Sequence, residues 1–423
     1  MNRYSYDVVV IGGGFAGAAA GICAARRNKK VLLIEKYNCM GGAAAFDLVN
    51  PFMAYWTWSR GNDRHKILLS KGIFGEIVER LTALGGLNTA NAMTFNEELV
   101  KYVLNTMAKE SGLALLYGTQ VTGVTKVEDQ IRSVTVSNVS GLSEIEADCF
   151  IDATGDANVA YLAGCPFRLG RDGDHLCQPM TLSFRLGNVH SDCNEGIRGR
   201  ISALYRQFKA EGKIKNPREN VLMFGTMTPG VLHFNTTRVI KRNPTNAWDV
   251  TEAEIEAREQ VIELYTFLRE NFEEFKDSVL LSTGLQIGAR ESRMIEGEYV
   301  LTAEDLLACR KFEDSIAVCN YDIDIHSPDG EGTSHYYFED ETYYTIPYRV
   351  LVPQNVKNLL VAGRCVSATH EAQASLRIMP TCATLGEAAG LAATLVCDEG
   401  CAARDLSVPA LQALLRQNGA KID

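Results

Sequence analysis

Residues 7–36 constrain the fold of this chain more than any other stretch. A short β-branched run over residues 8–11 leads into the glycine turn GGGFAG at residues 12–17, and a second apolar run over residues 31–34 ends at Glu35. A helix rich in small residues fits between the two runs. The stretch therefore predicts a β-α-β unit with a tight glycine turn at the start of its helix.

The three glycines of the G-x-G-x-x-G pattern have separate roles in such a unit. Gly12 permits the tight turn, Gly14 lets the backbone approach a pyrophosphate, and Gly17 lets helix and strand pack closely, while the helix N-terminus offers unpaired N–H groups. Glu35, at the end of the second strand, can accept hydrogen bonds from both hydroxyls of a ribose and would repel a 2′-phosphate. The pattern predicts a dinucleotide site that does not favour NADP; the alternative is a purely structural glycine turn.

Composition and charge narrow the function classes. The chain has 423 residues with 46% hydrophobic and 22% charged content, which fits two or three globular domains. A formal net charge of −10 argues against broad binding of nucleic acid or of an anionic membrane. No apolar run is free of glycine or charge over a bilayer's width, and the β-α-β unit accounts for the apolar N-terminus that otherwise resembles a signal peptide.

The cysteines and the loop at residues 322–331 give no metal signature. The twelve cysteines have no C-x-x-C pair and no zinc-type spacing, so we expect reduced thiols, a cytoplasmic location and no metal site. The acids and histidines of the loop match no known metal-binding spacing. An irregular solvated or pocket-edge loop is expected there.

The hydrophobic period changes along the chain. Helices are predicted at residues 71–84, with Leu84 on the apolar stripe, and at residues 96–111. From residue 113 the period is two, and a hairpin loop at residues 128–130 joins two strands of an antiparallel meander. Residues 149–156 complete that meander and end in a second glycine turn.

A second domain is expected to interrupt the first. Residues 1–165 and 345–423 form the predicted nucleotide-binding domain, and residues 166–344 form an inserted α+β substrate domain. Capping boxes predict helix starts at Thr251 and Thr302. The fold class is therefore α/β, with a Rossmann-like domain, an antiparallel β-meander and an inserted domain.

Four motifs together resemble a known family. They are GGGFAG with Glu35, the pair Gly41-Gly42, IDATGD at residues 151–156, and LLVAGR followed by MPTCATLGEAAG near the end. With them the chain resembles FAD-dependent oxidoreductases of the glutathione-reductase-type superfamily, which includes the fumarate reductase flavoproteins. The stretches GARESR and GRCVSATHEAQASLRIMPT are most similar to a bacterial branch usually called only "FAD-dependent oxidoreductase".

The resemblance implies FAD as cofactor and a set of residues that bind it. These are Gly12, Gly14, Gly17, Glu35, Lys36, Gly41, Gly42, Val121, Gly155, Asp156, Gly363, Arg364, Met379, Pro380 and Thr381. The helix that starts at residues 379–381 is implied to point at the pyrimidine edge of the flavin, where its N–H groups and dipole would stabilise negative charge. Many relatives have an acid at the position of Arg364, so the contacts on that side of the cofactor are open.

The interpretation of function that remains is a flavoenzyme. It would transfer a hydride to or from a small anionic or polyhydroxylated substrate. Only one dinucleotide fingerprint is present and a redox C-x-x-C is absent, so an external electron donor or acceptor is expected. His370 and Arg377 are the candidate acid-base and electrostatic residues, and Arg293 is a third. A structural hydrogen bond or ion pair is the alternative role for each of the three.

Two other function classes stay open. One is a flavin-dependent monooxygenase or RNA modifier on the same scaffold, and the other is a non-catalytic flavin-binding subunit that relays electrons or senses redox state. The acidic charge argues against RNA, and a homo-oligomer is compatible with all of these functions.

Overall fold

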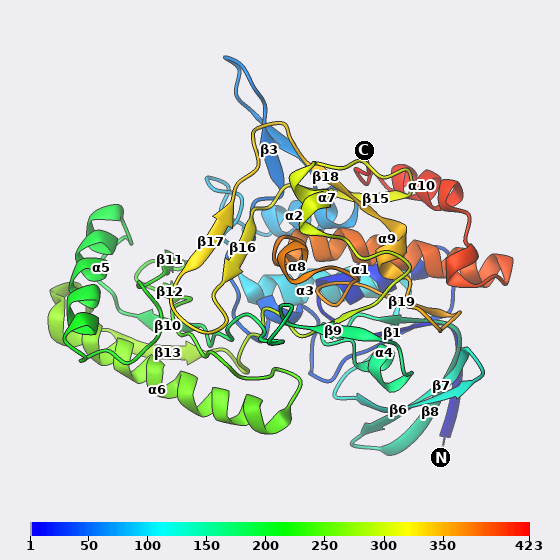
Figure 1. Ribbon diagram of the computed structural model, residues 1–423, viewed down its shortest axis with the longest axis horizontal. Helices are drawn as coiled ribbons and strands as arrows, with labels where there is room; N and C mark the ends of the chain where they lie inside the picture. Colours follow the sequence, from blue (N-terminus) through cyan, green and yellow to red (C-terminus); the bar gives the residue numbers. More distant parts are fainter. Residues whose placement is uncertain (1) are drawn as a thin grey trace.

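A seven-stranded sheet organises the molecule, which the computed structural model describes over residues 2–423 (Figure 1). Its strand order is β5-β2-β1-β8-β7-β6, and β19 also pairs with β8. β1 (Asn2–Ile11) lies parallel to β2 (Val31–Ile34), and α1 (Phe15–Ala25) connects them. The predicted β-α-β unit is confirmed, with every residue of α1 and β2 buried.

The long strand β8 (Gly141–Asp152) joins the parallel and antiparallel parts of this sheet. It runs parallel to β1 along its length, and its C-terminal half also pairs with β19 (Leu359–Val361). Its N-terminal half pairs antiparallel with β7 (Gln130–Asn138), and β7 pairs antiparallel with β6 (Gln120–Val127). The meander and its hairpin are thus confirmed, whereas β5 (Ala114–Leu116) extends the parallel edge beside β2.

Helices pack on this sheet with ends that the sequence explains. α3 (Glu97–Ser111) begins at an Asn96 cap and ends at Gly112 in the left-handed conformation. α2 (Ile73–Ala83) buries four residues of its apolar stripe, but the expected member Leu84 is its exposed C-cap. Leu84 follows the last helical turn, so it no longer shares the buried face.

α9 (Met379–Glu399) crosses α1 through the centre of the molecule (Figure 1). Gly386 and Gly390 allow the crossing, because a Cβ at either would lie within 2.3 Å of a backbone carbonyl oxygen of α1. Among residues 2–423, α9 is the one helix that could cross a membrane by length and composition, yet 89% of its apolar window is buried inside the protein. The last helix along the chain is α10 (Val408–Gln417).

A second hydrophobic cluster lies within residues 180–287, to one side of the main sheet (Figure 1). It contains α5 (Glu195–Ala210), α6 (Ala247–Asn271) and a four-stranded sheet. The strands of that sheet, in spatial order, are β11 (Met223–Gly225), β12 (Leu232–Phe234), β10 (Phe184–Gly187) and β13 (Val279–Thr283). The expected substrate domain contains this whole cluster, and its boundaries stay a prediction.

One predicted helix start is wrong and one is confirmed. Asn246, not Thr251, caps α6, and Thr251 lies inside the helix, where its hydroxyl bonds to the Ala247 carbonyl. The capping-box spacing at Thr251 occurs within a longer helical stretch. Thr302 caps α7 (Ala303–Leu307) with the reciprocal Asp305 bond.

The chain returns to the first hydrophobic cluster from residue 295 onward. β15 (Ser315–Cys319) pairs with β18 (Tyr344–Pro347) there. The expected irregular loop is instead the start of a hairpin, β16 (Ile323–His326) and β17 (Thr333–Tyr336), which extends towards the second cluster (Figure 1). Cross-strand pairing of His326 with Thr333 confines the irregular part to the turn.

The remaining elements are short. They are β3 (Trp56–Trp58) paired with β4 (Lys66–Leu68), α4 (Asn158–Leu162), β9 (Phe167–Leu169) paired with β14 (Arg293–Ile295), and α8 (His370–Leu376). The aromatic segment at residues 51–58 ends in the β3–β4 hairpin, with Phe52, Tyr55 and Trp56 buried.

Candidate active site

Two helices begin at the expected cofactor site without a capping side chain. Neither α1 nor α9 has a side-chain cap or an acidic residue in its first turn. α3, α5, α6, α7 and α8 are each capped by an Asn or Thr side chain, whereas α2, α4 and α10 also have no cap from their own N-cap residue. Since the first N–H groups of a helix have no intrahelical acceptor, α1 and α9 keep donors and a positive dipole end for an anionic ligand.

Backbone contacts between glycines form a cradle at the start of α1. A Cβ on Gly12 would lie 2.4 Å from the Ala153 carbonyl oxygen, and one on Gly17 would lie 1.8 Å from the Gly12 oxygen. A Cβ on Gly42 would lie 2.8 Å from the Cα of Gly14, and Gly41 donates its N–H to the Gly13 carbonyl at 2.8 Å. The turns at residues 12–17, 41–42 and 153–155 are thus in contact.

Glu35 closes one side of this cradle. Its buried carboxylate accepts N–H bonds from Gly13 and from Tyr37, the latter at 2.9 Å. Thr119 donates its N–H to the Glu35 carbonyl at 3.0 Å, which brings the start of β6, and with it Val121, to the same strand end. Lys36 is exposed, with its Nζ 4.8 Å from the centroid of the Tyr37 ring.

The second glycine turn is fixed by a buried carboxylate. Asp152 accepts bonds from Thr154 and from the N–H groups of Val159 and Ala160 at the start of α4. Burial raises the pKa of Asp152, against these hydrogen bonds. The turn through Gly155 is therefore held in one conformation beside α1.

Arg364 lies over this turn. Its guanidinium pairs with Asp156 at 2.6 Å and donates to the Ser292 hydroxyl at 3.0 Å. A Cβ on Gly155 would lie 2.9 Å from Arg364 Nε, and one on Gly363 would lie 3.2 Å from the Ala16 Cβ. Gly155, Asp156, Gly363 and Arg364 therefore form one group against the first turn of α1.

α9 begins beside this group. Met379 and Pro380 lie in its first turn, and Thr381 is buried with its hydroxyl 3.4 Å from Cys319 Sγ. The donor set fits FAD: two uncapped helix starts, a glycine cradle and a buried carboxylate at the end of β2. The start of α1 with its glycine cradle would hold the diphosphate. The start of α9 would hold the flavin edge, and Glu35 would hold the ribose.

His370 and Arg377 share one polar network. His370 Nδ1 lies 2.8 Å from Oε1 of Glu291, a carboxylate with no exposed surface, and Glu291 Oε2 accepts the N–H of Gln178 at 2.9 Å. The Gln178 side chain in turn accepts from Arg377 at 3.4 Å. Bonding of Nδ1 to a carboxylate orients the imidazole and leaves Nε2 available to hold a proton.

A second cluster of charges adjoins Arg377. Arg377 NH2 lies 3.7 Å from Asp324 Oδ2, and His326 Nε2 lies 3.4 Å from Asp324 Oδ1. Burial acts to raise the pKa of Asp324, but His326, Arg377 and Arg290 outweigh it and lower that pKa. Burial, followed by the charge of Arg290, lowers the pKa of His326, so its ring is neutral at pH 7.

Arg290 is the most strongly perturbed cation of this cluster. It donates to the Pro179 carbonyl at 2.7 Å and to the Thr181 hydroxyl at 2.6 Å. Burial lowers its pKa, and the like charges of Arg377, Arg218 and Arg238 add to the effect. Like charges gathered out of water indicate a site for an anion.

Arg293 lies elsewhere. It donates to the Asp156 carbonyl at 3.0 Å, and its guanidinium lies 4.2 Å from the centroid of the Tyr161 ring. It therefore stands beside the second glycine turn, apart from the network of His370 and Arg377.

Several residues of the cluster were not among the candidates from the sequence. They are Gln178, Arg218, Arg238, Arg290, Glu291, Asp324 and His326. The GARESR stretch and the acids and histidine of the hairpin were visible as polar residues between strands. Their common location depends on tertiary contacts that the sequence pattern does not contain.

The fold and the cradle are those of a Rossmann-type dinucleotide-binding protein. The family model described as "FAD dependent oxidoreductase" matches residues 7–415. The chain therefore belongs to this family, and it is an FAD-dependent oxidoreductase.

Solved structures are similar in fold at low sequence identity. The flavin-dependent brominase Bmp2 shares 12% identity and a TM-score of 0.48, with 98% of this chain and 83% of that chain covered. A geranylgeranyl bacteriochlorophyll reductase-like protein from Thermoplasma acidophilum shares 13% identity and a TM-score of 0.45, with 98% and 84% covered. p-Nitrophenol 4-monooxygenase PnpA from Pseudomonas putida DLL-E4 shares 11% identity and a TM-score of 0.44, with 100% and 82% covered. No curated protein matches the chain.

Proposed function

We propose that this enzyme exchanges a hydride between FAD and a small anionic organic substrate bound between the two hydrophobic clusters. The observation that carries this proposal is the group of largely buried cations around Arg290 and Arg377, next to the start of α9. Arg377 stands two residues before Met379, so an anion bound by its guanidinium would lie close to the cofactor end of α9. FAD, when bound, supplies the redox chemistry.

The residues of the chain would then divide the work. Arg377 and Arg290 bind and orient the acidic group of the substrate, because guanidinium groups match the geometry of oxyanions. His370, oriented by Glu291, holds or releases a proton at Nε2. Gln178 bonds both to the Glu291 carboxylate and to Arg377, so it would hold the proton-transfer group and the substrate-binding group at a fixed separation.

The wider assignments belong to the same proposal. We place the protein in the glutathione-reductase-type superfamily, with residues 1–165 and 345–423 as the FAD domain and residues 166–344 as the substrate domain. An external electron donor or acceptor, a cytoplasmic location and a possible homo-oligomer complete it. All twelve cysteines are free, which supports a reducing compartment.

The variant Arg377→Ala tests the proposal. It removes a charged contact to substrate, so kcat/KM should fall by roughly a hundredfold or more, while bound FAD measured by absorbance is unchanged. Arg258→Ala is the matched control, because Arg258 pairs with Glu254 on α6, outside both the network and the cofactor cradle, and it should keep most of the activity. Unchanged turnover in Arg377→Ala would refute the assignment, and oxygen-dependent formation of a hydroxylated product would point to a monooxygenase instead.

A further inference from the structure

Arg218 is a buried cation whose side chain has no partner in the described part of the chain. It is 4% exposed, and the Nε and NH1 atoms of its guanidinium are buried without a hydrogen-bond partner among residues 2–423. Its backbone, in contrast, is firmly held: Asn216 accepts its N–H at 3.0 Å, and its carbonyl accepts from Lys209 at 2.7 Å and Tyr205 at 3.3 Å. The loop therefore fixes an unpaired charge in the interior.

Such an arrangement is unfavourable for the folded state alone. A buried charge without a hydrogen-bonded partner loses its hydration, and a carboxylate that is near but not bonded to it replaces that hydration only in part. Burial lowers the pKa of Arg218, while the neighbouring Glu219 acts in the opposite direction. A bound anion would supply the missing partner.

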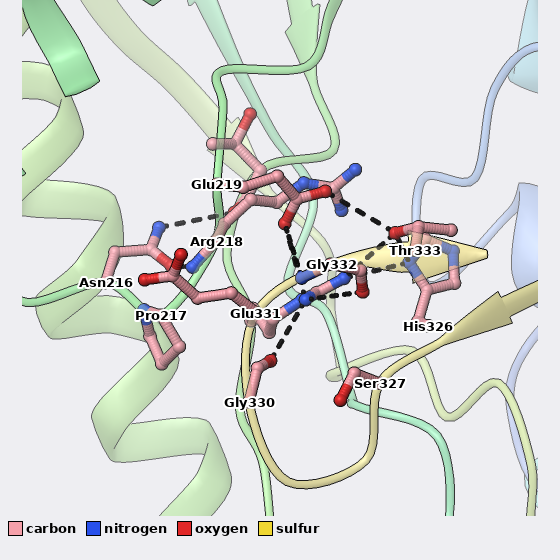
Figure 2. Close-up of polar contacts among 12 residues, drawn as sticks. Asn216, Pro217, Arg218, Glu219, His326, Ser327, Gly330, Glu331, Gly332 and Thr333 are labelled. Atoms are coloured by element: carbon pink, nitrogen blue, oxygen red, sulfur yellow. Dashed lines mark hydrogen bonds and ion pairs between the residues drawn. The ribbon is translucent and has the colours of Figure 1, made fainter.

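Arg238 forms the facing side of this location. It is 1% exposed, and its NH1 donates to the carbonyls of Gly330 and Gly332, each at 3.1 Å. Its NH2 lies 3.1 Å from His326 Nδ1 and 3.2 Å from the Thr333 hydroxyl. Arg238 thereby fixes the turn of the β16–β17 hairpin, whose Gly332 and Thr333 also bond to Glu219, the residue next to Arg218 (Figure 2).

The carboxylates of the cluster leave Arg218 without a direct partner. Arg218, Arg238 and Arg377 all act on Arg290, so four guanidinium groups share one electrostatic environment. Asp324, Glu219 and Glu331 act on these arginines, and the buried Glu291 is linked to Arg377 through Gln178. None of these carboxylates bonds to the buried Nε and NH1 of Arg218 within the described residues, so this guanidinium is the one that a ligand would pair with.

We propose that Arg218 binds a second acidic oxyanion group of the substrate, a carboxylate or a phosphate ester, at the end away from the flavin. The substrate would then have one acidic group at Arg377 and another at Arg218. Arg238 and the hairpin turn position this distal subsite. The inference rests on the proposed function, because it describes the same substrate.

The test uses anion binding by the FAD-loaded protein without turnover. The thermal midpoint is measured against sodium phosphate and sodium succinate, with sodium chloride at equal ionic strength as reference. We expect saturable stabilisation of the wild type by phosphate, succinate or both, beyond the effect of chloride. Phosphate alone would indicate a phosphate ester, and succinate alone would indicate a dicarboxylate.

Variants assign the effect to Arg218. In Arg218→Met the midpoint without anion should be equal to or above that of the wild type, because an unpaired charge is removed. Its apparent Kd for the anion should be at least about tenfold weaker, which corresponds to about 1.4 kcal/mol. Arg218→Lys, which keeps a positive charge, should retain part of the affinity.

Arg185→Met is the matched control. Arg185 is also largely buried, but it is paired with Glu97, so its loss should lower the midpoint and leave the anion response intact. The proposal fails if the wild type responds only as it does to chloride, or if Arg218→Met responds like the wild type. It also fails if Arg218→Met lowers the midpoint as Arg185→Met does. Activity of Arg377→Ala is a separate readout, so failure of the hydride-transfer proposal is distinguishable.

Discussion

Gly386→Ala should both destabilise the protein and weaken FAD binding, because it acts on the crossing of α9 and α1. In the middle of a helix, glycine to alanine normally stabilises by about 1 kcal/mol. Here the new Cβ would lie 2.0 Å from the Ala16 carbonyl oxygen and 2.8 Å from the Ala16 Cα. These are backbone atoms that cannot rotate away, so the two helices must separate.

The expected magnitude follows from two opposing effects. Overpacking of a core typically costs 1–3 kcal/mol, and a clash with backbone belongs at or above the upper end. Subtracting the propensity gain of about 1 kcal/mol leaves a net loss of about 2 kcal/mol. In a chain of this size such a loss lowers the thermal midpoint by roughly 2 °C.

The cofactor site should change with it. Ala16 lies in the first turn of α1, directly after the Gly14 cap, so a displaced α1 moves the donors that would face the diphosphate. The interaction of a helix N-terminus with an anion contributes about 0.3–1 kcal/mol, and up to about 2 kcal/mol when partly buried. FAD affinity, measured by fluorescence titration, should therefore fall by roughly two- to fivefold, and by up to about thirtyfold if the diphosphate is partly buried.

Gly199→Ala is the control for this experiment. Gly199 is also inside a helix, α5, but nothing lies within 4 Å of its added Cβ. It should raise the midpoint slightly and leave FAD affinity unchanged. If Gly386→Ala behaves like Gly199→Ala, the close crossing of α9 and α1 does not position the cofactor site, and the reasoning is refuted.

Two further predictions concern pH dependence and helix capping. Burial raises the pKa of Glu387 to about 7 from an ordinary 4.5, so the folded state holds this proton more tightly and stability should fall between about pH 4.5 and pH 7. Glu387→Gln should remove up to about 3 kcal/mol of this loss of stability with rising pH, and it should be more stable than the wild type at pH 8. The part of the loss that is due to Asp47, whose pKa burial also raises to about 7, should remain. Equal pH profiles of the thermal midpoint for the variant and the wild type would contradict this prediction. Asn246→Ala should cost about 1 kcal/mol in stability as the cap of α6 is lost, whereas Thr251→Ala should stay within about 0.5 kcal/mol, and equal losses would argue against the observed start of α6.

The cofactor half of the site could be predicted because its signals are local. A strand, a glycine turn and the start of a helix are contiguous at residues 7–17, and the geometry of each follows from its own residues. The uncapped start of α9 is equally local, with Pro380 in the first turn and no Asn, Ser or Thr before Met379 to cap it. Local patterns also mislead: Thr251 has capping-box spacing, but the helix had already started at Asn246.

The substrate half of the site escaped prediction because it is assembled from distant segments. Arg218 and Arg238 come from the second hydrophobic cluster, His326 from a hairpin of the first, and Arg377 from the end of α8. No periodicity links these positions, and each residue alone looks like an ordinary surface charge. Only the fold shows that they are withdrawn from water together.

That withdrawal is itself an argument about function. The chain satisfies other buried charges at close range: Asp152 accepts four hydrogen bonds, and Glu291 binds both His370 and the Gln178 backbone. Arg218 lies in equally firm surroundings without such a partner. Because an apolar residue of similar size would serve the fold better at that position, the guanidinium is best explained by what binds to it. Substitution of each arginine of this cluster by methionine would therefore distinguish two roles. The free energy of unfolding should rise where the arginine binds a ligand and fall where the arginine stabilises the fold.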